Sequence, residues 1–227
     1  MALTATLVFL GSVLRILPVP ALGAILVAAA LGMIQVGALR EIWRISRMEF
    51  VFALIALWGP IGLGVLNGVV IAIGATLVYM LRKMMYPRDA MLGVIAGRDG
   101  FYKLHRRPEA RPVPGLAICL IEGSLLFFNT DIVQARLRTI AAELPSGTRW
   151  LLLDASAIVQ VDSTAAAMLD EVRAELAEQG ISLGLAEVHA EARAMLDRAG
   201  VTGRIGPAMI FDDLEDALRA FEARPET

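Results

Sequence analysis

The 227-residue sequence predicts two unlike parts, a membrane α-helical segment followed by a soluble α/β domain. Long apolar stretches with few charges fill the chain up to about Leu81, as in membrane helices. From about Pro114 onward, short apolar runs alternate with helical patterns, as in a sheet covered by helices. The charge divides at the same place. Six Lys/Arg and two acids give +4 over residues 1–86, and the remaining 15 Lys/Arg and 21 acids give −6 over residues 87–227.

The composition excludes several classes of site. Cys119 is the only cysteine, so an intrachain disulfide and a Cys-based zinc site are impossible, and a small buried strand residue is expected there. The two histidines, His105 and His189, lack the spacing of metal ligands. Because there is no Walker-type loop and no Ser/His/Asp order, we predict no enzyme activity, catalytic residue, metal or cofactor. The acidic second part argues against nucleic-acid binding.

Three apolar or amphipathic helices are predicted over the first 49 residues. Residues 1–14 are apolar, but as a helix they would measure only about 21 Å, short of the roughly 20 residues that span a bilayer. They look like the second part of a helix. Residues 21–36 form the next helix, whose Ala and Gly content allows close helix packing. Residues 35–49 carry three arginines among apolar positions, which predicts a short amphipathic helix at the membrane interface.

Residues 50–81 carry no charged side chain. As a single helix, these 32 residues would measure about 48 Å, against a hydrocarbon core of about 30 Å. The Gly/Pro-rich centre therefore predicts a hairpin of two short helices, 50–59 and 66–81. One long kinked helix is the alternative.

Basic residues predict the orientation of the hairpin. Because Lys and Arg favour the cytoplasmic side, the Arg40–Arg47 segment and the cluster of Arg82, Lys83 and Arg88 are expected in the cytoplasm. The uncharged turn near residue 62 is expected on the other side. Arg15, near the outer face, is an exception to the rule.

Residues 87–112 are predicted to link the two parts. Four prolines occur between residues 87 and 114, and proline stiffens a tether. Three arginines of this segment could contact anionic lipid head groups, or they could remain solvated beside the soluble domain.

The soluble domain is predicted over residues 113–227. Short apolar runs indicate strands at 116–121, 125–128, 150–153, 181–185 and 210–211. Capped amphipathic patterns indicate helices at 132–144, 164–179, 190–198 and 214–221. The first two runs flank Glu122-Gly123 and are expected to pair as a hairpin. The run at 150–153 is apolar throughout, which is typical of a buried central strand.

Asp162, Ser163 and Thr164 stand where a loop enters a predicted helix. Such residues cap exposed N–H groups, and the residues by themselves favour this simple interpretation. The functional alternative is a regulatory site, in which an exposed hydroxyl at the positive end of a helix accepts a phosphate.

These residues carry a resemblance. The string LLLDASAIVQVDSTAAAMLDEVRAEL at 151–176 resembles the core of a STAS domain, which is shared by bacterial anti-sigma-factor antagonists and the tails of SulP anion transporters. LPVPALGAIL at 17–26, the uncharged stretch 50–81, YPRDAMLG at 86–93 and FFNTDIVQARL at 127–137 resemble the SulP pattern in order and spacing. The chain is therefore identified as resembling the C-terminal part of a SulP anion transporter.

The resemblance implies a function for each part. Residues 1–86 would be the last membrane helices of a SulP domain and residues 113–227 its cytoplasmic STAS domain, in a multi-pass protein of the cell (inner) membrane. SulP proteins move anions such as sulfate, bicarbonate or dicarboxylates and usually work as dimers. The family places its anion site on helices upstream of these. The substrate-binding residues are thus unknown here, and a fragment without transport activity of its own is expected.

The alternative is a membrane-tethered STAS module that regulates a cytoplasmic protein partner. In antagonist STAS proteins the Ser after Asp is phosphorylated, and that position is Ser163 here. In SulP tails this role is not general, and Ala165-Ala166-Ala167 replaces the Gly-Leu typical of antagonists.

Overall fold

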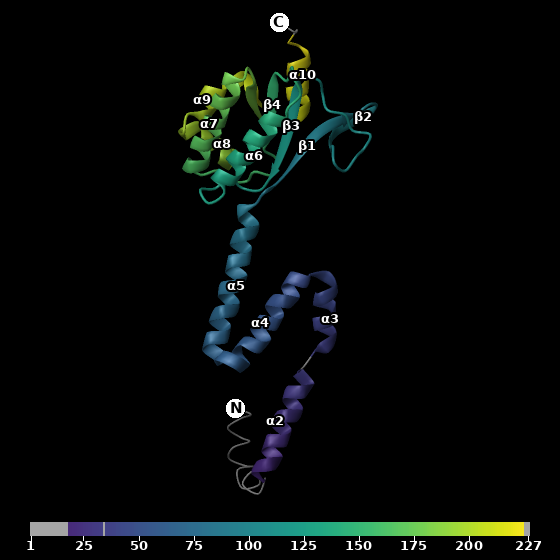
Figure 1. Ribbon diagram of the computed structural model, residues 1–227, viewed down its shortest axis with the longest axis vertical. Helices are drawn as coiled ribbons and strands as arrows, with labels where there is room; N and C mark the ends of the chain where they lie inside the picture. The colour runs from purple at the N-terminus through teal and green to yellow at the C-terminus, as the bar shows by residue number, and fades with distance from the viewer. Residues whose placement is uncertain (1–17, 34, 225–227) are drawn as a thin grey trace, which may run out of the picture. The chain divides into compact units, whose positions relative to one another are not determined.

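The computed structural model describes residues 18–33 and 35–224, which divide into two compact units between Val78 and Tyr79 (Figure 1). The helix predicted over residues 1–14 and the expectation for Arg15 lie outside the described residues. Within them, the two kinds of structure that the sequence predicts are both present, apolar helices first and a mixed α/β domain after them.

The helices before the sheet follow the predicted order. They are α2 (Val19–Met33), α3 (Val36–Ile45), α4 (Arg47–Leu63) and α5 (Val65–Met85). The amphipathic α3 is confirmed, and the Trp43 ring packs edge-on against Phe50 of α4 with ring centroids 4.9 Å apart. The Ser46 hydroxyl accepts a hydrogen bond from the Glu49 N–H and so caps α4. By length and composition, α5 can cross a membrane, as can the stretch Val19–Ile45.

A tight turn joins α4 to α5, so residues 50–81 form two helices rather than one kinked helix. Gly64 makes the turn with φ 83°, a conformation that favours glycine. At Gly68 an added Cβ would lie 2.2 Å from the Pro60 backbone nitrogen, so the helices meet there only because glycine has no side chain. The first helix runs four residues past the predicted end at Gly59, because Pro60 is accommodated inside α4.

The second unit is built on a six-stranded sheet of order β2-β1-β3-β4-β5-β6. The strands are β1 (Arg88–Ile95), β2 (Arg98–Lys103), β3 (Leu116–Glu122), β4 (Trp150–Asp154), β5 (Ser182–Ala186) and β6 (Ile210–Phe211). Strands β3 to β6 are parallel, and β1 is antiparallel to both of its neighbours. The carboxyl ends of four parallel strands therefore share one edge, where binding residues commonly gather.

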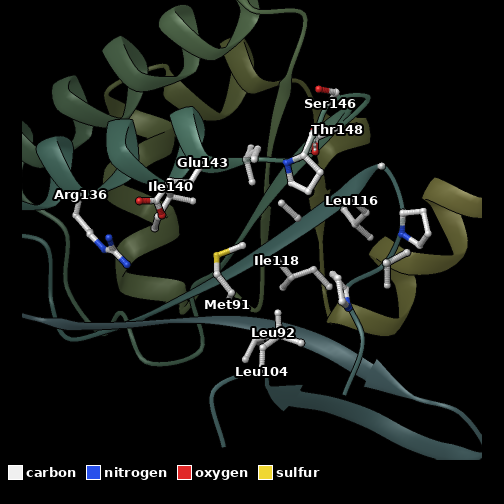
Figure 2. Close-up of a pocket in the computed structure, with 17 residues that line it drawn as sticks. Met91, Leu92, Leu104, Leu116, Ile118, Arg136, Ile140, Glu143, Ser146 and Thr148 are labelled. Atoms are coloured by element: carbon white, nitrogen blue, oxygen red, sulfur yellow. Dashed lines mark hydrogen bonds between the residues drawn. The ribbon is translucent and has the colours of Figure 1, made fainter. Parts of the chain in front are cut away.

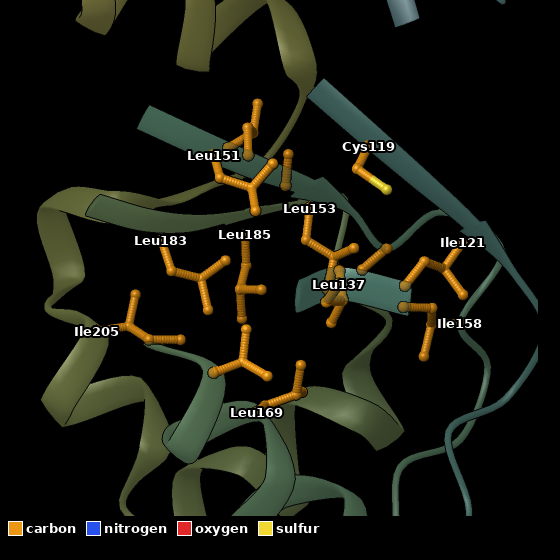
Figure 3. Packing of buried hydrophobic residues seen from close by; sticks show 14 of the residues in the cluster. Cys119, Ile121, Leu137, Leu151, Leu153, Ile158, Leu169, Leu183, Leu185 and Ile205 are labelled. Atoms are coloured by element: carbon orange, nitrogen blue, oxygen red, sulfur yellow. The ribbon is translucent and has the colours of Figure 1, made fainter. Parts of the chain in front are cut away.

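Helices cover the sheet. They are α6 (Thr130–Glu143), α7 (Ser163–Glu178), α8 (Ala190–Arg198), α9 (Val201–Ile205) and α10 (Leu214–Glu222), with a 3₁₀ turn at Pro207–Met209. The four predicted helices are confirmed to within two residues at each end, and α9 is additional. Leu151 and Leu153 of β4 lie in the buried cluster with Leu169 of α7 (Figure 3). Trp150 instead packs on Phe221 of α10, as the alternation of a strand requires.

Two sequence predictions for the start of the soluble part were wrong. Residues 88–103, expected within a linker, form β1 and β2. Strand β1 contains polar residues and therefore lacks the apolar run that predicts a strand. Its Ala90 and Leu92 are nevertheless buried. The predicted hairpin around Glu122-Gly123 is also absent from the described residues. Strand β3 pairs with β1 and β4, and Leu125 forms a parallel bridge with Val161.

Candidate functional site

Asp162 stands at the start of α7 and makes contacts in two directions. Its Oδ1 accepts a hydrogen bond from the Ala165 N–H at 2.9 Å, which caps the helix. Its Oδ2 accepts a second hydrogen bond from the Phe127 N–H at 2.6 Å, across 35 residues of sequence. The carboxylate therefore joins α7 to the loop of residues 123–129, hereafter the β3–α6 loop.

Ser163 and Thr164 are the first two residues of α7, and both are exposed. Among the described residues, the side chains of Ser163 and Thr164 have no hydrogen-bond partner. The capping predicted for this triplet is thus performed by Asp162, and the two hydroxyls remain accessible. Phe127, which Asp162 holds through its backbone, is 69% exposed. The structure brings an apolar ring and two hydroxyl-bearing residues to the same edge of the sheet.

Asn129 holds the β3–α6 loop from the other side. Asn129 is the residue just before α6, but its side chain makes no capping hydrogen bond to that helix. It is 1% exposed, its Oδ1 accepts a hydrogen bond from the Leu126 N–H at 2.9 Å, and its Nδ2 donates to the Ser124 carbonyl at 3.0 Å and the Met84 carbonyl at 3.2 Å. The last bond ties the end of α5 to the loop, which no local sequence signal could show.

Acidic groups lie behind this edge. Asp154, at the end of β4, is buried and accepts a hydrogen bond from the Ser156 N–H at 2.9 Å. Burial, and then the negative charge of Asp154 and other acids, raises the pKa of the Glu187 carboxyl. Glu187 also adopts φ 55°, a conformation rare for residues other than glycine. This edge is therefore poor in positive charge and unsuited to bind an inorganic anion by charge attraction.

A cavity of about 430 Å³ lies elsewhere in the second unit, between α6 and strands β1 and β3 (Figure 2). Apolar side chains such as Met91, Leu92 and Ile118 line most of it. Arg136 borders it, but its guanidinium forms two hydrogen bonds to Asp89, at 3.0 and 2.8 Å, which raise the pKa of Arg136. Because this cation is already paired, the cavity suits an apolar group better than an anion. No pattern in the sequence indicates this cavity.

Comparisons with known proteins match the first and the second part of the chain to two different family models. A family model described as STAS domain matches residues 107–217, and one described as Sulfate permease family matches residues 1–56. A probable sulfate transporter of Mycobacterium tuberculosis is 34% identical over 218 residues, which are 96% of this chain and 39% of that protein. The chain belongs to the sulfate permease (SulP) family. It is a membrane protein with a STAS domain.

A plant relative and a solved structure are also matched over part of their length. Probable sulfate transporter 3.3 of Arabidopsis thaliana is 33% identical over 202 residues, which cover 86% of this chain and 32% of that protein. The SulP chain thus spans about a third to two fifths of these relatives. The murine Solute Carrier 26 family member A9 anion transporter, in its inward-facing state, matches with a TM-score of 0.74 at 18% identity, over 82% of this chain and 30% of that one. This match confirms the predicted fold.

Proposed function

We propose that the chain forms the C-terminal portion of a secondary inorganic-anion transporter. Its apolar helices would contribute to the gate region, and its STAS domain would be a regulatory or dimerising tail. The observation that carries the proposal is the ordered match of both parts to SulP sequences, together with the fold shared with an anion transporter. The relatives' names make sulfate the first substrate to test, with bicarbonate and dicarboxylates as the other anions of the class.

The described residues also support the expectation that anion binding needs helices beyond these. From α2 to residue 81, every basic side chain lies on α3 or at the start of α4. An anion site near the midplane of a transporter is formed by broken helices that point their N-termini at the substrate. The α4–α5 turn offers no charged side chain for such a site. We therefore propose that the chain alone does not transport.

We further propose that the STAS domain lies in the cytoplasm. Arg82 and Lys83 end α5 just before the sheet domain, and basic residues favour the cytoplasmic side. Labelling of the introduced cysteine of Ser146→Cys in inverted and right-side-out vesicles tests this placement, because Ser146 is exposed and Cys119 is buried. Labelling only in inverted vesicles is expected, and labelling only in right-side-out vesicles would refute it.

The transport proposal is tested with a chimaera. The part of the mycobacterial relative that this chain matches, 39% of that protein, is replaced by this chain. Sulfate uptake into proteoliposomes is then compared with that of this chain alone. We expect uptake by the chimaera and none by the chain alone. Uptake by the chain alone would refute the need for further helices. A folded, dimeric chimaera that moves neither sulfate, bicarbonate nor a dicarboxylate would refute the role in transport.

A second function is favoured by the accessible Ser163 hydroxyl. A phosphate on Ser163 would add about −1.5 to −2 charge at a helix N-terminus, directly beside the Asp162 carboxylate. Repulsion would weaken the 2.6 Å hydrogen bond that holds Phe127, and the β3–α6 loop would loosen. We propose that this loop is the part through which a tethered STAS module would bind a cytoplasmic protein partner.

The switch is tested by hydrogen exchange in Ser163→Asp, with Ser146→Asp as the matched control because Ser146 is an exposed serine in the loop before β4. Faster exchange in residues 123–129 is expected for Ser163→Asp alone. If Ser163→Asp leaves both loop exchange and the proteins captured from a cytoplasmic extract unchanged, the switch is excluded.

A further inference from the structure

A groove runs between the end of α5 and the β3–α6 loop. Its volume is about 320 Å³, and both of its walls belong to the second unit. Met80, Lys83 and Met84 form one wall, and Leu126 and Phe128 form the other. The three α5 residues follow the i, i+3, i+4 spacing of one helix face. The groove is thus an apolar surface with a cation on its wall, at the end of a helix long enough to span a bilayer.

Positive charge at the groove is available to a ligand. Lys83 also borders a second hollow that is lined by Arg82 and two tyrosines. Among the described residues, neither Arg82 nor Lys83 forms an ion pair. The one acid that borders the groove, Glu122, is paired with Lys103. Two unpaired cations therefore stand beside apolar side chains.

We propose that the groove binds an anionic phospholipid. The phosphate would contact Lys83 and Arg82, and the upper part of an acyl chain would lie against Met80 and Met84, which are 60% and 48% exposed. A bilayer supplies this ligand where α5 leaves it, and juxtamembrane basic residues attract anionic lipids. The groove also adjoins the proposed partner-binding β3–α6 loop, because its wall residues Leu126 and Phe128 flank Phe127 in that loop. This inference rests on membrane insertion and not on transport.

Native mass spectrometry of the full chain tests the proposal. The protein is delipidated in neutral detergent and titrated with dioleoylphosphatidylglycerol or dioleoylphosphatidylcholine. We expect preferential binding of phosphatidylglycerol. Because each basic residue near an anionic surface contributes about fivefold, Arg82→Gln/Lys83→Gln should bind it roughly 25-fold more weakly. Met84→Gln, which leaves the charge unchanged, should weaken binding several-fold.

The matched control is Arg106→Gln/Arg107→Gln, which removes the same charge from an exposed loop of the same unit. This variant should bind phosphatidylglycerol as the parent does. An equal loss in both double variants would show a general charge effect and overturn the site. Equal binding of the two lipids, or equally tight binding of glycerophosphoglycerol without acyl chains, would also overturn it. All of these readouts are independent of sulfate uptake, so failure here and failure of the transport proposal are distinguishable.

Discussion

Removal of the Asp162 carboxylate should loosen two segments that are far apart in sequence. Loss of a helix cap costs about 1 kcal/mol, and loss of a hydrogen bond to a charged acceptor costs about 1.5–3 kcal/mol. Because Asp162 makes one of each and is partly exposed, we expect Asp162→Ala to lower the local opening free energy by about 2–3 kcal/mol. At about 1.4 kcal/mol per tenfold, amide hydrogen exchange should quicken roughly 30- to 140-fold.

Hydrogen exchange of the full chain, read by mass spectrometry, separates the two contributions. Asp162→Ser keeps the capping oxygen and loses the second acceptor, so exchange should quicken in residues 123–129 and much less at the start of α7. In Asp162→Ala it should quicken in both. Exchange within threefold of the parent in both segments of Asp162→Ala would refute the double role. Equal acceleration of exchange at the start of α7 in Asp162→Ala and Asp162→Ser would also refute it.

Four further outcomes are expected. Burial raises the pKa of the Cys119 thiol to about 12, so N-ethylmaleimide should label it only after unfolding, and labelling of the native protein would contradict its burial. Burial is the main cause that raises the pKa of the Glu187 carboxyl. The protonated carboxyl therefore stabilises the native state at low pH, and this stabilisation is lost as pH rises through the raised pKa. Glu187→Gln should therefore raise the melting temperature at about pH 8 but not at about pH 4, and an equal rise at both would count against this. Asn129→Ala leaves the partly buried Leu126 N–H and Ser124 carbonyl without their side-chain partner and should cost about 2–3 kcal/mol. A lower melting temperature is expected, and an unchanged one would contradict this. Gly68→Leu should disrupt the α4–α5 turn and broaden the size-exclusion peak in detergent, whereas Gly74→Leu, whose Cβ has open space, should not.

The sequence predicted those elements whose own residues determine them. Strand β4 is apolar at four consecutive positions, and α8 carries its amphipathic pattern within nine residues. The hairpin of α4 and α5 followed from its length and its glycines. Strand β1 was missed because its burial depends on partners elsewhere. Residues such as Asp89 and Gly93 are typical of loops, and they become part of a strand by pairing with other strands, Asp89 with Ile121 of β3 and Gly93 with Tyr102 of β2.

The candidate site shows the same limit. Asp162 was identifiable as a cap because a cap contacts its own helix. Its second hydrogen bond, to Phe127, and the bond from Asn129 to Met84 join segments 35 and 45 residues apart. Single-sequence patterns contain no information on such pairs. The long-range links of this site therefore became visible only in the structure.

The loss of the predicted linker changes what the STAS domain can do. Helix α5 ends at Met85 and β1 begins at Arg88, so two residues connect them where 26 were expected. A long tether would absorb movement of a membrane helix, whereas a two-residue connection leaves little chain between the end of α5 and a strand that pairs with β3. Asn129 adds a second connection from the same helix end to the loop held by Asp162. The proposed switched regulatory module requires that events at the helix end and at Ser163 influence each other. These two short connections are the physical route by which they could.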